Sequence, residues 1–185
     1  KFKTDCAVNG EAIPYVEDFE VYIGGPATKD LPNCWNIILQ EYTDDENTIN
    51  YYPNISTNSA SAHAGSKCLY FYYASSGDVV FNDKPQFMSL PMMAEDLSKL
   101  QFSFWMKAGG ASYIGDTVYV GVMSDPTDLA TFDTLQLIRT TLNYTEYIIR
   151  LDNYKGNGKY IALMKTPREA TRSVFIDDVK VDYLS

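Results

Sequence analysis

Apolar and polar residues alternate along most of the chain, a pattern typical of strands that bury one face. The clearest example is 100–107, where every even-numbered residue is apolar and Trp105 shares the other side with polar neighbours. The pattern predicts about ten short strands, at 13–20, 35–40, 69–74, 79–81, 100–107, 117–123, 135–140, 147–151, 160–164 and 174–183. So many half-buried strands need a second sheet to cover them. We therefore expect one all-β domain over 1–185, a two-sheet antiparallel β-sandwich with its core in about 13–184.

Helices have little room between these strands. Residues 94–99 and 127–131 could each form a single turn, but neither carries an apolar stripe over several turns. Two long stretches, 21–33 and 42–67, show no regular pattern. Loops of this length in a compact domain are often functional.

Charge and hydropathy narrow the possible partners. The chain has 24 acidic and 15 basic residues, a net charge of −9, which argues against a nucleic-acid backbone or an anionic lipid surface. No apolar run approaches the ~20 residues of a membrane helix, so we expect no membrane insertion by this domain. The start at Lys1 lacks the apolar stretch of a signal peptide. We expect such a segment to be removed by processing or to lie outside this sequence.

The three cysteines, Cys6, Cys34 and Cys68, match no zinc-binding spacing. One interpretation is that they are small buried hydrophobic residues. The other is a disulfide between Cys34 and Cys68, because both lie at the edges of apolar runs. The residues themselves leave both possibilities open.

Catalytic chemistry has few candidates. His63 is the one histidine, so a nucleophile system that needs an imidazole has a single candidate. It lies in a Ser/Ala/Gly segment, where we expect a surface or loop-packing role. Two carboxylates could form a glycoside hydrolase pair, but nothing in the order of residues selects one. An enzyme is therefore the weakest of the functions considered.

Paired carboxylates occur near both ends of the chain, in 17–20 and at Asp177 and Asp178. Aspartate is depleted in strands and costly to bury without a partner. These residues could form a solvated strand edge that discourages edge-to-edge pairing. They could also form a calcium site, because calcium prefers carboxylate and backbone oxygens.

Several short motifs occur in a fixed order along the chain. They are Glu17-Asp18-Phe19-Glu20, Leu31-Pro32-Asn33-Cys34-Trp35, Gly65-Ser66-Lys67-Cys68-Leu69-Tyr70-Phe71, Pro85-Gln86-Phe87 with Leu90-Pro91, 97–105, 120–125 and Phe175-Ile176-Asp177-Asp178-Val179. Together they resemble the cleaved-adhesin and choice-of-anchor domains of secreted bacterial surface proteins, relatives of the MAM domain. The resemblance covers about 15–184. It implies a jelly roll of the galactose-binding or MAM-like type, no catalysis by the domain itself, an extracellular or cell-surface location, and calcium near the first and last strands.

The resemblance also implies the ligands of that ion. Glu20 matches a Phe-Glu motif, and Asp177 and Asp178 match an Asp-Asp pair before an aliphatic residue. Strict alternation would turn Asp177 to the side of Val179, although a bulge would reverse this. We expect a structural calcium that ties the chain ends together. Its candidate ligands are Glu20, Asp177, Asp178 and oxygens of the segment from His63 to Ser66, with Asp44 and Asp45 as weaker candidates.

Aromatic residues are the second group of candidates for a binding role, and the chain has fifteen tyrosines, nine phenylalanines and two tryptophans. Exposed aromatic rings can stack on sugar faces while polar neighbours hold the hydroxyl groups. Ordinary packing within the sandwich is the alternative for each ring, and Trp35 is assigned to the core. The main ligand-binding candidates are Trp105, Tyr113, Tyr119 and Tyr72, followed by Tyr51, Tyr52, Tyr144 and Tyr154.

These features favour a non-catalytic binding or adhesion module whose partner is a glycan or a host surface protein. The alternative is a purely structural domain that supports a neighbouring module. A glycoside hydrolase ranks behind both.

Overall fold

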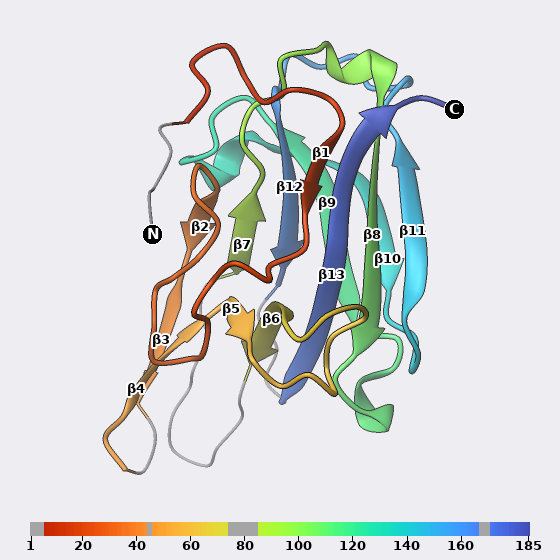
Figure 1. Ribbon diagram of the computed structural model, residues 1–185. Coiled ribbons are helices and arrows are strands. Elements are labelled where there is room, and N and C mark those ends of the chain that lie inside the picture. Colours follow the sequence, from red (N-terminus) through yellow and green to blue (C-terminus); the bar gives the residue numbers. More distant parts are fainter. Residues whose placement is uncertain (1–5, 44–45, 74–84, 167–170) are drawn as a thin grey trace.

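The computed structural model describes residues 6–43, 46–73, 85–166 and 171–185. They form two antiparallel sheets packed face to face, with a small two-stranded ribbon at one side (Figure 1). This is the two-sheet sandwich that the alternation predicts.

The sheet nearer the viewer in Figure 1, the front sheet, has the order β11-β8-β13-β6-β5, and β1 pairs with the far part of β13. Its strands are β11 (Thr145–Arg150), β8 (Leu100–Ala108), β13 (Arg172–Tyr183), β6 (Cys68–Tyr73), β5 (Asn54–Ser56) and β1 (Tyr15–Glu17). Because β1 lies beside β13, the first and last strands are neighbours in space.

The back sheet has the order β10-β9-β12-β7-β2. Its strands are β10 (Phe132–Arg139), β9 (Thr117–Met123), β12 (Tyr160–Lys165), β7 (Gln86–Ser89) and β2 (Asn36–Ile38). The ribbon consists of β3 (Gln40–Thr43) and β4 (Ile49–Tyr52).

The core lies between the sheets and follows the predicted alternation. Along β8, Phe102, Phe104 and Met106 are fully buried, while the residues between them are half-buried on the outer side. In the back sheet, alternate valines of β9 face the same core. Trp35 is 7% exposed and its Nε1 donates to the Tyr15 hydroxyl at 2.7 Å, which confirms its assignment to the core.

Most predicted strands are present with shifted ends, and three differences stand out. The stretch 42–67 was expected to be irregular, but it contains β4 and β5. The strand β7 was not predicted, because all four of its residues are buried and it shows no alternation. The strand predicted at 79–81 lies outside the described residues.

Helical structure is confined to single 3-10 turns in the described part of the chain: η1 (Leu97–Lys99), η2 (Ala111–Tyr113) and η3 (Leu129–Thr131). The first and third fall inside the predicted turns, and η2 was not predicted. None of the helices among the described residues is long and apolar enough to cross a membrane.

A bulge in β13 changes which residues face the core. Asp177 pairs with Trp105, but Lys180 pairs with Ser103, so the register shifts between them. Asp178 lies in the shifted stretch with φ 48°. As a result Asp177 shares the outer side with Trp105, while Val179 is fully buried in the core. Of the two arrangements left open by the sequence, the structure has the one with a bulge, which places Asp177 and Val179 on opposite sides.

The disulfide joins Cys6 to Cys34, so the proposed Cys34–Cys68 pairing is wrong. The physical reason is the fold: Cys34 precedes β2 of the back sheet, whereas Cys68 begins β6 of the front sheet. Cys68 is a buried free thiol. Burial raises its pKa to about 12.

Candidate functional site

The 57–67 loop joins β5 to β6 and crosses the outer side of β13 (Figure 1). Two side chains, one from β8 and one from the turn before β11, bond to the first half of this loop. The Tyr144 hydroxyl donates to the Ser61 carbonyl at 2.7 Å, and Lys107 Nζ donates to the Ala60 carbonyl at 3.3 Å. The loop is therefore bonded to residues of β8 and of the turn before β11.

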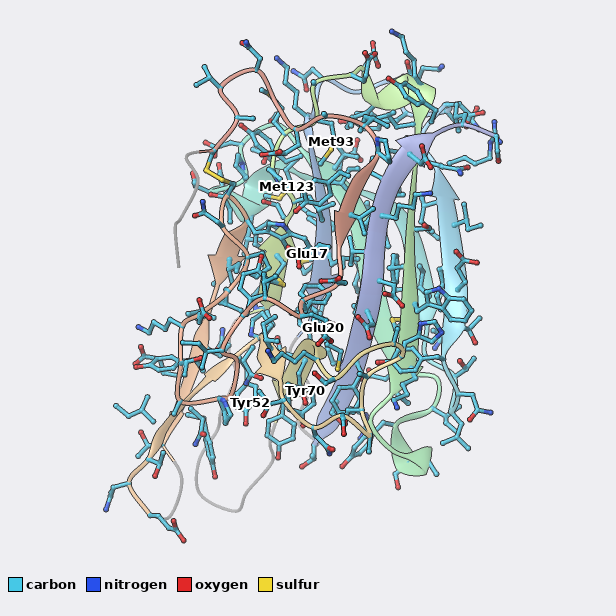
Figure 2. The ribbon with its side chains drawn as sticks, viewed as in Figure 1. Glu17, Glu20, Tyr52, Tyr70, Met93 and Met123 are labelled. Carbon is cyan, nitrogen blue, oxygen red and sulfur yellow. A yellow bond between two sulfur atoms is a disulfide. The ribbon has the colours of Figure 1, made fainter. Side chains whose placement is uncertain are left out.

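Glu20, shortly after β1, holds the end of the loop (Figure 2). Its Oε1 accepts from the backbone N–H groups of Ser66 and Lys67, both at 2.7 Å, and its Oε2 accepts from Ser66 Oγ at 2.8 Å. The Ser66 backbone bond is the largest cause of the lowered pKa of Glu20. In return, Lys67 Nζ donates to the Glu20 carbonyl at 2.9 Å. These reciprocal bonds fix the loop to the start of the chain.

Asp177 holds the middle of the loop from β13. Its Oδ2 accepts from the backbone N–H groups of His63 and Ala64 at 2.8 and 3.3 Å, and its Oδ1 accepts from the N–H of Asp178 at 2.8 Å. Burial raises the pKa of Asp177 to about 6, against the opposing effect of these bonds. Glu20 and Asp177, both predicted as metal ligands, thus contact the same loop, and their role as ligands stays a prediction.

His63 adds a side-chain attachment. Its Nδ1 lies 2.6 Å from Asp178 Oδ2. Its ring stacks on Trp105 with centroids 4.0 Å apart and planes inclined by 12°, and it meets the edge of Tyr144 at 5.1 Å. The expected loop-packing role of His63 agrees with these contacts.

The carboxylates can be tested for a fit to calcium, which takes six to eight oxygen ligands. Here Glu20 and Asp177 accept N–H donors from the loop. Across the four described ranges, no three His, Cys, Asp or Glu side chains converge to hold a metal. The N–H bonds of these two carboxylates anchor the loop. Calcium stays a prediction from the resemblance, and the weaker candidates Asp44 and Asp45 lie outside the described residues.

A cluster of aromatic rings continues from the loop across the outer side of the front sheet. Tyr70 stacks on Phe175 with centroids 4.7 Å apart, and Tyr70 and Tyr72 lie 5.7 Å apart. Tyr52 of β4 packs against both tyrosines at 5.7 and 5.0 Å. Figure 2 labels Tyr52 and Tyr70 beside each other at this end of the sheet. Tyr70, Tyr72 and Phe175 are half-buried, so part of each ring remains accessible.

Lys107 connects this cluster to the rings under the loop. Its Nζ lies 5.6 Å from the centre of the Phe175 ring and 4.6 Å from the centre of the Tyr144 ring. Cations are attracted to such ring faces. The rings thus form one continuous series, the aromatic band, which comprises Tyr52, Tyr70, Tyr72, Phe175, Tyr144, His63 and Trp105.

The four main ligand-binding candidates divide between the two sheets. Trp105 and Tyr72 belong to the aromatic band. Tyr113 lies in η2, next to the band. The pKa of Tyr72 is raised mainly by burial, and the electrostatic interaction with the Tyr113 phenol is the second cause. Tyr119 lies on β9 of the back sheet, away from the band.

The sequence reasoning missed Tyr70 and Phe175 as members of the band. Both lie in strands that were predicted, although with shifted ends, and they are cross-strand partners on the outer side of β6 and β13. Tyr70 and Tyr72 are two positions apart on β6 and face the same side, so alternation along this strand would have identified Tyr70 together with Tyr72. Phe175 could be identified only with the position of the bulge in β13, because the side on which alternate residues lie changes there.

No protein-family model and no curated protein match the sequence. Among solved structures, similar ones are three cleaved adhesin domains of Lys-gingipain, of which K1 and K3 come from Porphyromonas gingivalis W83. The K2 domain has a TM-score of 0.65 and 14% identity, over 93% of this chain and 99% of that domain.

The K3 and K1 domains have TM-scores and coverages close to those of K2. K3 has a TM-score of 0.62 and 16% identity over 91% of this chain and 98% of that domain. K1 has a TM-score of 0.61 and 15% identity over 89% of this chain and 99% of that domain. Identity this low shows similarity of fold alone. The chain therefore has the β-sandwich fold of the cleaved adhesin domains, in agreement with the resemblance of its motifs.

Proposed function

We propose that this chain is a non-catalytic binding module that takes a carbohydrate on the outer side of its front sheet. The aromatic band carries the proposal. It extends over four strands and the 57–67 loop, and its rings are packed against one another while several remain half-exposed. A series of amphipathic rings on one open sheet face is suited to ligands that are apolar on one side and polar on the other.

The polar groups of this face suit the hydroxyl groups of a sugar. The Lys107 ammonium lies among the rings, and the Arg172 guanidinium lies 5.8 Å from the centre of the neighbouring Tyr113 ring. Both groups donate hydrogen bonds and accept none. Sugar C–H faces would pack on the Tyr72 ring and on the part of the Trp105 ring that the stacked His63 leaves accessible, and the hydroxyl oxygens would accept from these cations.

The carboxylates beside the band support binding and not hydrolysis. Glu20 and Asp177 accept backbone N–H groups of the 57–67 loop. A glycosidase needs two carboxyl groups that face the scissile bond from opposite sides, and these two are committed to the loop. The proposal also includes an extracellular or cell-surface location, which the fold of the cleaved adhesin domains supports.

Glycan-array screening followed by titration calorimetry tests this proposal. Binding should fall at least about fivefold in Tyr72→Ala and in Trp105→Ala, because each removes a stacking ring worth about 1–3 kcal/mol. The matched control is Tyr119→Ala, an equally half-buried tyrosine on the back sheet. It should leave binding unchanged.

Three results would contradict the proposal. A glycan that binds equally well to wild type and Tyr72→Ala would place the site elsewhere. No bound glycan together with a bound protein partner would favour the adhesion alternative, and no bound partner of either kind would favour a structural accessory domain.

A further inference from the structure

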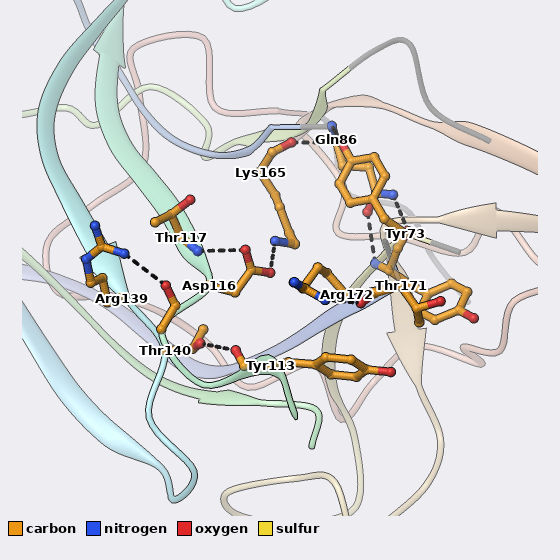
Figure 3. Close-up of polar contacts among 12 residues, drawn as sticks. Tyr73, Gln86, Tyr113, Asp116, Thr117, Arg139, Thr140, Lys165, Thr171 and Arg172 are labelled. Carbon is orange, nitrogen blue, oxygen red and sulfur yellow. Dashed lines mark hydrogen bonds and ion pairs between the residues drawn. The ribbon is translucent and has the colours of Figure 1, made fainter. Parts of the chain in front are cut away.

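Lys165 and Asp116 are in contact inside the sandwich (Figure 3). Lys165 Nζ meets Asp116 Oδ2, and the two side chains are 0% and 2% exposed. A fully buried lysine is rare and needs a partner. The aromatic band lies on the outer side of the other sheet, so the proposed binding function does not explain this pair.

The fold places both side chains at the same end of the core. Lys165 is the last residue of β12 and follows the buried Leu163 by two positions, so it points inward. Asp116 immediately precedes β9 and stands two positions before the buried Val118. The strands β12 and β9 are antiparallel neighbours, with Met164 opposite Tyr119. The register therefore brings the two side chains together from adjacent strands.

Further contacts fix the geometry of the pair. Asp116 Oδ1 accepts from the backbone N–H of Thr117 at 2.9 Å. The Tyr73 hydroxyl donates to the Lys165 carbonyl at 2.8 Å and accepts from the Gln86 backbone N–H at 2.7 Å. These bonds hold the backbone of Lys165 and one oxygen of Asp116, as Figure 3 shows.

The dry surroundings change the balance between an ion pair and an amide. In water, ammonium and carboxylate are each strongly hydrated, and this hydration favours the separate ions over condensation. Inside a protein that hydration is lost, and two buried charges cost several kcal/mol each before their attraction is counted. Transfer of one proton from Lys165 Nζ to Asp116 Oδ2 gives a neutral amine in contact with a neutral carboxylic acid.

We propose that Lys165 and Asp116 condense to form an intramolecular isopeptide bond. The lone pair of Lys165 Nζ attacks Cγ of Asp116, and negative charge develops on Oδ1. The Thr117 N–H that already donates to Oδ1 stabilises this charge. A second proton passes from Nζ to Oδ2, which leaves as water while the carbonyl re-forms. Ammonium and carboxylate thus give one secondary amide and one water, without an oxidant or cofactor.

The bond would join the end of β12 to the start of β9, residues 49 positions apart in the chain. A cross-link of this kind restricts the unfolded chain in the same way as a disulfide. Unlike the Cys6–Cys34 bridge, it resists reducing agents. It would keep two central strands of the back sheet together.

Intact-mass spectrometry of the purified, denatured and reduced protein tests this proposal. We expect a mass lower than that of the sequence by one water molecule. Tryptic digestion should give a branched peptide that contains both Asp116 and Lys165, because trypsin does not cleave at an acylated lysine. Lys165→Arg should have its full sequence mass, since the guanidinium cannot form this amide. The control Lys159→Arg, at an exposed lysine, should still lack one water.

The wild-type measurement decides the proposal even where Lys165→Arg fails to fold. A full-length mass for the wild type, with Asp116 and Lys165 in separate linear peptides, would show a non-covalent pair and overturn it. Loss of water with the two residues still in separate peptides would also overturn it, because a cyclic imide at an aspartate loses water without any cross-link.

Discussion

His63 of the 57–67 loop stacks face to face on Trp105 of β8, with ring centroids 4.0 Å apart. The two rings connect the loop that follows β5 to the middle of the front sheet. Since His63 Nδ1 also lies 2.6 Å from Asp178 Oδ2, one imidazole contacts both β8 and β13. Trp105 therefore supports the loop as well as the proposed ligand surface.

Removal of the imidazole should loosen this loop. In His63→Ala we expect stability to fall by about 1 kcal/mol or more, because two aromatic contacts, with Trp105 and Tyr144, and one hydrogen bond to a carboxylate are lost. Hydrogen exchange should accelerate at the loop amides of Ala64, Ser66 and Lys67, whose N–H groups bond to Asp177 and Glu20. Exchange measured by mass spectrometry, with the core of β8 as an internal reference, checks this.

Asp178→Asn tests the contact between Asp178 and the His63 ring without changing the backbone conformation of the bulge. Asp178 has φ 48°, a conformation that asparagine adopts as easily as aspartate. The variant should therefore keep the bulge and weaken only the bond to His63, with a smaller acceleration of loop exchange than His63→Ala. Equal exchange in wild type and both variants would show that the imidazole contacts do not hold the loop.

Glu20 provides a second test of how the loop is held. Glu20→Ala removes the acceptor of two backbone N–H groups and of Ser66 Oγ, and we expect a loss of about 1 kcal/mol at this half-buried position. Because these bonds need no ion, the loss should be the same in chelator and in excess calcium. The control is Glu146→Ala on exposed β11, which should change the melting midpoint little.

The same melts test the calcium ion implied by the sequence resemblance. A wild-type midpoint that is higher in calcium than in chelator would support it, because a ligand that binds the folded state raises stability. The ion would then be a partner of Glu20 if the effect of Glu20→Ala appeared only in calcium. The same midpoint in calcium and in chelator would contradict the prediction.

Alternation along the chain was enough to predict the sandwich and much of its core. In β8 and β9 the polar and apolar positions are regular, so the strands and their buried faces follow directly from the period of two. Local pattern failed where a strand is buried on both sides, as in β7. It also failed at the bulge of β13, since one extra residue reverses every later position.

The site was predictable only in part, for reasons that lie in long-range contacts. The motifs brought Glu20, Asp177 and the 57–67 loop together. They did not show that the loop turns its N–H groups toward both carboxylates, because backbone direction in an irregular segment has no sequence period. The partner of Cys34 depended on which sheet each cysteine joins, which no local spacing reveals.

The cysteine assignment can be checked by counting thiols. Without reductant, the denatured protein should take up one alkylating group per chain, because Cys6 and Cys34 are bridged and only Cys68 is free. In the native protein Cys68 should react far more slowly, since it is buried and its pKa is raised to about 12, so thiolate is scarce near neutral pH. Three labelled cysteines in the unreduced protein would refute the bridge.

Gly65 offers the sharpest test of the contact between the loop and Glu20. It has φ 63°, and a Cβ at this position would lie 2.5 Å from Glu20 Oε1. Gly65→Ala should therefore combine backbone strain of about 1–2 kcal/mol with displacement of the Glu20 carboxylate from its N–H donors. We expect a lower melting midpoint and faster exchange at the amides of Ser66 and Lys67.

Gly115→Ala is the matched control for this substitution. Gly115 has φ 81°, also in the left-handed region, but a Cβ there would meet nothing within 4 Å. Its alanine variant should carry the backbone strain alone and leave loop exchange at the wild-type rate. The difference between the two variants then isolates the contact with Glu20. If both lower the midpoint equally and neither changes exchange at Ser66, the Glu20 carboxylate does not hold this end of the loop.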